Sequence, residues 1–182
     1  MSRDHPFLFL STAFSYPETN TLQSMEPALC ALAADLGMDN LPQGKLPTTS
    51  HQDLQAEYVR LFINALGGVP APPYASIYIQ GSGILMQQGY DQALAFYRQA
   101  GLEPADTSEC SDHLSHELAF IGILIDSGQD ALLAEFLRDH IMQWYPPFLH
   151  RLQRAEPFPF YSLLGRVTHL CLKYIEKEVV HE

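Results

Sequence analysis

Basic side chains are scarce in this sequence of 182 residues. It has 10 Lys and Arg against 21 Asp and Glu, which gives a formal net charge of −11. Nucleic acids and anionic membrane surfaces are bound through cationic protein surface, which this chain hardly offers. We therefore expect no nucleic-acid partner, whereas a cationic partner is compatible with the composition.

Paired cysteines and long apolar runs are also missing. The three cysteines, Cys30, Cys110 and Cys171, lie far apart, and no Cys-x-x-Cys pair occurs. A disulfide framework is therefore not expected, which favours a reducing compartment. Residues 1–6 lack the apolar run of a signal peptide, and the longest apolar stretch, 118–125, is far shorter than the roughly 20 residues of a spanning helix. The sequence predicts a soluble cytoplasmic protein without stable membrane insertion.

Strand-like alternation is absent, and apolar residues instead recur at helical spacing between prolines and glycines. We predict an all-α fold of about eight or nine helices in one compact domain. Within it, a hinge-like linker (101–111) joins an N-terminal half (1–100) to a C-terminal half (112–182). The expected helices cover residues 7–14, 22–36, 50–65, 77–88, 91–99, 112–127, 130–145 with a continuation to 154 after a kink at Pro146-Pro147, and 158–179.

Several helix ends and faces carry local signals. Gly37 follows the second expected helix as a C-terminal glycine does, and Ser50 with Asp53 resembles a capping box. The helix at 112–127 is apolar on two faces, which is typical of a central helix covered nearly all round. The sequence thus predicts where two helices end or begin and which one is central.

The charge is unevenly distributed along the chain. Residues 61–97, the uncharged segment, contain a single charged side chain, Asp91. Residues 103–139, the acidic block, contain nine acids and one base, a net charge of −8. The uncharged segment also holds prolines and aromatic residues, a composition that suits a peptide-binding groove.

The densest group of potential metal ligands lies at residues 110–117, which read Cys-Ser-Asp-His-Leu-Ser-His-Glu. His113 and His116 are three residues apart, so a helix places them on neighbouring positions of one face. A metal-dependent enzyme that uses His113, His116 and Glu117 is therefore one hypothesis, although the order differs from the known zinc signatures. The competing interpretation is a polar helix start, with Asp112 near the positive end of the helix dipole.

No cofactor loop is recognisable. Gly81-Ser82-Gly83 lacks the Lys-Ser/Thr of a phosphate loop and the third glycine of a dinucleotide loop. No nucleophile in a Gly-x-Ser-x-Gly setting accompanies the histidines either. We predict no cofactor, no bound metal and no enzymatic activity.

Several motifs occur in a fixed order, and their combination is specific. They are Glu57-Tyr58-x-x-Leu61-Phe62-Ile63, Pro72-Pro73-Tyr74-x-Ser76-x-Tyr78, Glu103-Pro104, Asp112-His113-Leu114-x-x-Glu117-Leu118-x-Phe120, Phe136-Leu137-x-x-His140-x-x-x-Trp144 and Pro159-Phe160-Tyr161-x-x-Leu164. In this order, from about residue 7 to residue 175, the chain resembles the TorD/DmsD/NarJ group of cytoplasmic chaperones for molybdoenzyme maturation.

The resemblance implies a helical chaperone without catalysis. Its partners would be the precursor of a molybdenum-cofactor oxidoreductase and the twin-arginine leader of that precursor, held until cofactor insertion is complete. The resemblance also implies a monomer or a domain-swapped dimer. The candidate residues for leader or client binding are Leu61, Phe62, Pro72, Pro73, Tyr74, Tyr78, Asp112, His113 and Glu117.

A twin-arginine leader has two guanidinium groups followed by an apolar run, and the charge distribution matches it. The acidic block would attract the arginines, and the uncharged segment would hold the apolar run. An arginine pairs bidentately with a carboxylate, which Asp112 or Glu117 could supply. An alternative hypothesis is a helical adaptor that binds an internal segment of the client instead of the leader.

Overall fold

The computed structural model describes residues 5–18, 22–38, 50–79, 84–103 and 109–180. Every regular element within these ranges is helical, which confirms the predicted all-α class. Two of the elements are π-helical turns, named η1 and η3. The elements are α1 (Phe7–Ala13), α2 (Leu22–Asp35), α3 (His51–Tyr58), η1 (Val59–Ile63), α4 (Ala75–Tyr78), α5 (Gln88–Gln99), α6 (Leu114–Ser127), α7 (Asp130–Phe136), η3 (Leu137–Ile141), α8 (Met142–Arg154) and α9 (Pro159–Val180).

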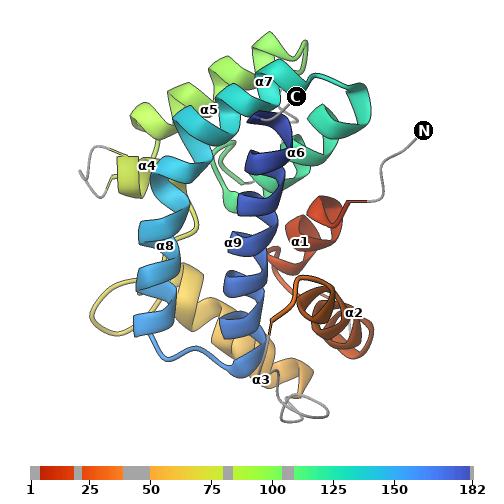
Figure 1. Ribbon diagram of the computed structural model, residues 1–182. Coiled ribbons are helices and arrows are strands. Elements are labelled where there is room, and N and C mark those ends of the chain that lie inside the picture. The colour runs from red at the N-terminus through yellow and green to blue at the C-terminus, as the bar shows by residue number, and fades with distance from the viewer. Residues whose placement is uncertain (1–4, 19–21, 39–49, 80–83, 104–108, 181–182) are drawn as a thin grey trace.

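The helices pack around a central pair (Figure 1). Helices α8 and α9 run side by side, with α1 and α2 on one flank and α4 and α5 on the other, while α3 crosses the lower end. Helix α1 also packs along α6, so the start of the chain contacts the C-terminal half. Among the described residues, no helix combines the length and the apolar character needed to cross a bilayer.

One hydrophobic core draws side chains from both halves of the chain. Helix α6 lies inside it, as its two apolar faces predict, with Leu118, Phe120, Ile121 and Leu124 at most 2% exposed. Helix α8 contributes its large aromatic side chains to the same core. Because a single core joins the halves, the two halves cannot separate without exposing apolar surface, which costs free energy.

The local signals at the helix ends are confirmed. The Ser50 hydroxyl accepts a hydrogen bond from the Asp53 backbone N–H at 3.1 Å and caps α3. Gly37 adopts φ = 69° after α2, where the Met38 N–H reaches the Ala33 carbonyl at 3.0 Å. This left-handed position suits glycine, which has no Cβ to clash with the backbone.

Two details of the helix prediction are wrong. The helix expected over 77–88 is wrong at both described parts: α4 ends at Tyr78, where Ile79 is extended, and residues 84–87 are not helical. Among these, Met86 adopts φ = 56°, a value that a right-handed helix excludes. Gly81 and Gly83 lie outside the described residues. The prolines at 146 and 147 lie inside α8 and do not end it. The π turn η3 comes directly before α8, so the regular α-helical pattern is interrupted there and not at the prolines.

The linker predicted at 101–111 is described only at its two ends, since 104–108 fall outside the described residues. At its second end, Tyr97 donates a hydrogen bond from its hydroxyl to the Ser111 carbonyl at 2.7 Å. The residues just before α6 are therefore fastened to α5. A hinge in this linker stays a prediction.

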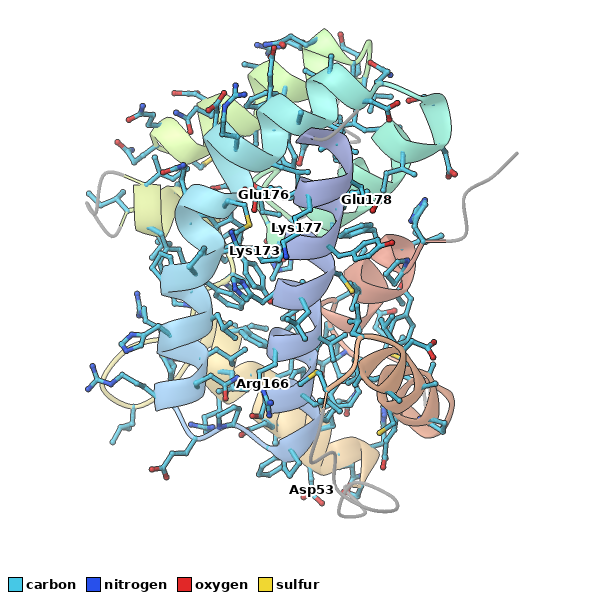
Figure 2. The ribbon with its side chains drawn as sticks, in the orientation of Figure 1. Asp53, Arg166, Lys173, Glu176, Lys177 and Glu178 are labelled. Atoms are coloured by element: carbon cyan, nitrogen blue, oxygen red, sulfur yellow. The ribbon has the colours of Figure 1, made fainter. Side chains whose placement is uncertain are left out.

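The long C-terminal helix α9 carries charged residues towards its end. Figure 2 shows Arg166, Lys173, Glu176 and Lys177 along this helix, and Lys173 donates to Glu176 at 2.9 Å. An exposed ion pair of this kind contributes little to stability. The basic residues come after the first turn of α9. The first turn therefore carries aromatic side chains and no positive charge.

Candidate functional site

The Pro-Pro-Tyr corner is paired with the start of α6. Tyr74 and His113 form an isolated antiparallel bridge. The Leu114 N–H donates to the Pro73 carbonyl at 2.8 Å, and the Ala75 N–H donates to a carbonyl just before His113 at 3.1 Å. Two motifs that are almost forty residues apart in the sequence therefore form one rigid corner.

Arg151 of α8 holds the chain that enters this corner. Its guanidinium donates to the Pro70 carbonyl at 2.8 Å and to the Val69 carbonyl at 2.9 Å. The same group lies 5.5 Å from the centre of the Tyr78 ring, within cation–π range. The rigid fork of the guanidinium suits two adjacent carbonyls, so Arg151 is a positioning residue for the corner.

A pocket of about 220 Å³ opens where this corner meets α1 and η1. The pocket brings together four of the predicted residues, Phe62, Pro73, Tyr74 and His113. Sequence reasoning did not select the other seven as binding residues for a leader. The complete lining is Ser15, Tyr16, Tyr58, Phe62, Ile63, Pro73, Tyr74, Glu109, His113, Ser115 and His116.

Glu109 is the acidic residue of this lining. It accepts a hydrogen bond from the Tyr74 hydroxyl at 2.7 Å and one from the Cys110 N–H at 3.2 Å. Burial and the bond to Glu109 together raise the pKa of Tyr74, which therefore stays a neutral donor at pH 7. The carboxylate is partly buried and accessible from the pocket.

His113 is held in its neutral form. Its Nδ1 accepts from the Ser115 N–H at 3.2 Å, which caps α6, and lies 2.7 Å from the Ser115 hydroxyl. Burial lowers the pKa of His113 to about 4, an effect that Glu109 opposes and His116 reinforces. At pH 7 this imidazole therefore adds no positive charge to the pocket.

This shift predicts how stability depends on pH. Because the pKa of His113 is lower in the folded state than its ordinary value of 6.5, the folded state binds fewer protons at this site. The stabilisation is complete above about pH 6.5 and is lost as the pH falls towards 4. His113→Asn keeps a capping acceptor but does not titrate, so its thermal midpoint is expected to fall less steeply between pH 6.5 and 4. Parallel midpoint curves for the two proteins would contradict this assignment.

Asp112 and Glu117 lie beneath the pocket and are both 0% exposed. Asp112 accepts from the Ser76 N–H at 2.9 Å and so caps the start of α4. Glu117 accepts from Trp144 at 2.9 Å and lies 2.7 Å from a nitrogen of His140. In this arrangement both carboxylates hold neighbouring protein groups in place, and a role for them in leader binding stays a prediction.

The remaining predicted residues belong mainly to the core. Leu61 is 0% exposed, whereas Phe62, one step further along η1, reaches the pocket wall. A π turn adds a residue to the helical path, and such turns occur frequently at functional sites. Tyr78 stacks on Trp144 with ring centres 5.7 Å apart, and Pro72 is partly buried in the corner.

The three side chains of the metal hypothesis do not converge. His116 donates from Nδ1 to the Cys110 carbonyl at 3.0 Å, while Glu117 faces the core. Throughout the described ranges, no group of three His, Cys, Asp or Glu side chains is placed to hold a metal ion. The geometry gives the metal-dependent enzyme no support.

Comparison with known proteins yields one consistent group. A family model described as nitrate reductase delta subunit matches residues 20–150. A TorD chaperone from Psychrobacter sp. is 30% identical over 154 residues, 72% of this chain and 68% of that protein. A DmsD from Haemophilus influenzae, named as a Tat proofreading chaperone, is 27% identical over 118 residues, 64% of this chain. This match spans 57% of the length of the DmsD, so the curated relatives are matched over only part of their length.

A solved structure shares the fold over nearly the whole chain. It is the crystal structure of a protein from Archaeoglobus fulgidus assigned to redox enzyme maturation. The identity is 28% with a TM-score of 0.61, and the alignment covers 97% of this chain and 94% of the other. The similarity therefore extends over both halves of the chain.

Proposed function

The chain belongs to the family of nitrate reductase delta subunits and TorD chaperones, and on this basis we propose that it is a cytoplasmic chaperone for molybdoenzyme maturation. It binds the twin-arginine leader of an immature molybdenum-cofactor oxidoreductase. It keeps this precursor from export or assembly until the cofactor has been inserted. The protein itself performs no catalysis.

The pocket between α1, η1 and the Pro-Pro-Tyr corner is the observation that carries this proposal. A guanidinium that enters it meets the Glu109 carboxylate and the rings of Tyr16, Tyr58 and Tyr74. A carboxylate pairs with arginine, and aromatic faces attract its charge. Because His113 is neutral, it adds no positive charge that would oppose this attraction.

The charge distribution supports an encounter with a cationic segment. The acidic block, with its net charge of −8, surrounds the sequence position of Glu109. Such a field speeds the approach of a twin-arginine peptide and weakens as salt screens it. Leader binding should therefore lose affinity with rising salt, mainly through slower association.

The body of the immature enzyme would contact apolar side chains outside the pocket. Leu66, Ile84, Leu85 and Met86 of the uncharged segment are all exposed, Leu66 entirely so. Apolar side chains that lie together on the surface are typical of protein-binding surfaces, and Ile84, Leu85 and Met86 are adjacent in the sequence. They offer the incompletely folded client a second contact beside its leader.

Glu109→Gln tests the proposal most directly. The glutamine keeps an acceptor for Tyr74 but loses the negative charge, so the fold is preserved while the pairing with arginine is weakened. We expect about a tenfold loss of affinity for a synthetic twin-arginine leader, measured by calorimetry at low salt. Glu103→Gln is the matched control, because it removes one charge from an exposed position of the same acidic block.

Equal affinities of the two variants would show that Glu109 does not receive the arginine. A wild-type protein that binds no leader, yet retains a client from which the leader has been removed, would favour the adaptor hypothesis. Both comparisons use the same purified protein, and circular dichroism verifies that each variant is folded.

A further inference from the structure

A second pocket of about 330 Å³ lies directly beside the first, between α1, α2, α3 and α9. The two pockets share the walls formed by Ser15 and Tyr16. No motif in the sequence marked this region as a binding site. The complete lining is Thr12, Ala13, Ser15, Tyr16, Pro17, Glu18, Met25, Leu54, Phe160 and Tyr161.

The two pockets form neighbouring parts of one surface. Tyr16 is 42% exposed and stands edge-on to Tyr58, with ring centres 5.5 Å apart. Tyr58 lines the first pocket and Tyr161 the second, and these two rings are 6.3 Å apart. An aromatic floor therefore continues from one pocket to the other beneath Tyr16.

The wall between the pockets is held in place by hydrogen bonds on both sides of Tyr16. The Tyr58 hydroxyl donates to the Phe14 carbonyl at 3.1 Å, and the Gln55 side chain donates to the Pro17 carbonyl at 2.8 Å. Both donors come from α3, so the segment after α1 is fixed to that helix. The second pocket is thus a preformed feature, which lowers the entropic cost of binding.

The two pockets differ in chemistry. The first contains a carboxylate, two histidines and two serines besides its aromatic rings. The second is built chiefly from Ala13, Met25, Leu54 and Phe160, with Glu18 as its charged residue. A twin-arginine leader has a matching arrangement, because its charged residues are followed by apolar ones.

We propose that the second pocket receives an apolar side chain from the run that follows the twin arginines, with the leader crossing over Tyr16. This inference rests on the proposed function and assigns a binding site to the apolar part of the leader. In an extended peptide, alternate side chains lie on the same face about 6.6 Å apart. A leader that crosses Tyr16 in this conformation turns every second side chain to the same face, and so can offer one side chain to each pocket.

Met25→Glu tests the assignment, because it puts a carboxylate into the apolar pocket at a partly buried position of α2. Two synthetic peptides are compared by fluorescence anisotropy: the twin-arginine motif with its apolar run, and the same motif with the run replaced by serine. Met25→Glu should weaken the first peptide about tenfold and leave the second unchanged. Met25→Leu, which conserves volume and polarity, should bind both as the wild type does.

Ala31→Glu is the charge control, since it adds a carboxylate to an exposed position of the same helix. Circular dichroism and the thermal midpoint show whether each variant is folded. Equal effects of Met25→Glu on both peptides, or no effect on either, would overturn the inference while leaving the proposed function intact. If Met25→Glu bound either peptide more tightly than the wild type does, the second pocket would hold an arginine. That result would also overturn the inference. Failure of the wild type to bind either peptide would reject the proposed function and this inference together.

Discussion

Replacing Glu117 with alanine is expected to lower the free energy of unfolding by about 2–6 kcal/mol, because two buried groups lose their shared hydrogen-bond partner at about 1–3 kcal/mol each. Glu117 lies 2.7 Å from a nitrogen of His140 and accepts from Trp144 at 2.9 Å. All three side chains are 0% exposed. Burial raises the pKa of Glu117, against the opposing effect of His140. Without the carboxylate, the indole N–H and the imidazole remain in the core without their shared acceptor.

Urea unfolding followed by circular dichroism measures this loss. Glu135→Ala is the matched control, since Glu135 is an exposed acid on the neighbouring helix α7. Glu117→Gln keeps one acceptor and should lie between the control and Glu117→Ala. If Glu117→Ala unfolded at the same urea concentration as the control, the contacts of Glu117 with His140 and Trp144 would contribute nothing to stability. Where the variant is folded, unchanged affinity for the leader would show that Glu117 makes no contact with it.

Much of the fold could be predicted from the sequence because the signals are local. Ser50 caps α3 through a residue three positions away, and Gly37 ends α2 through its own backbone conformation. The two apolar faces of α6 directly reflect its burial. In contrast, α4 ends because Ile79 turns to an extended backbone with ψ = 123°, which no residue pattern requires.

The site could be predicted only in part, because it is assembled from distant segments. Tyr74 and His113 were recognised through motifs, and the structure brings them together at the corner. Tyr16 comes from the end of α1, so its place beside them follows only from the packing of α1 on α6. Glu109 precedes the Asp-His motif by three residues and was a candidate only as one acid among many. The sequence showed Asp112 as an acidic residue, but it did not show the Ser76 backbone N–H that donates to this side chain in the core.

The close contact between α4 and α5 predicts a second large effect, at Gly89. A Cβ at this position would lie 2.5 Å from the Ser76 nitrogen and 2.6 Å from the Ala75 carbonyl carbon. Backbone atoms cannot move aside as the end of a flexible side chain can, so Gly89→Ala must push α4 away from α5. Alanine favours a helix by about 1 kcal/mol over glycine. Overpacking costs about 1–3 kcal/mol, so the net effect is expected to be destabilising.

The displacement should also reach the binding pocket, because α4 directly follows Tyr74 and is capped by Asp112. We therefore expect Gly89→Ala to lower both the thermal midpoint and the affinity for a twin-arginine leader, although Gly89 lines neither pocket. Gln88→Ala, at the exposed neighbouring position, is the control and should leave both unchanged. A Gly89→Ala protein as stable as the wild type and equally able to bind the leader would mean that α4 can shift without moving the corner. The corner would then be fixed from the α6 side alone, through the Leu114–Pro73 hydrogen bond.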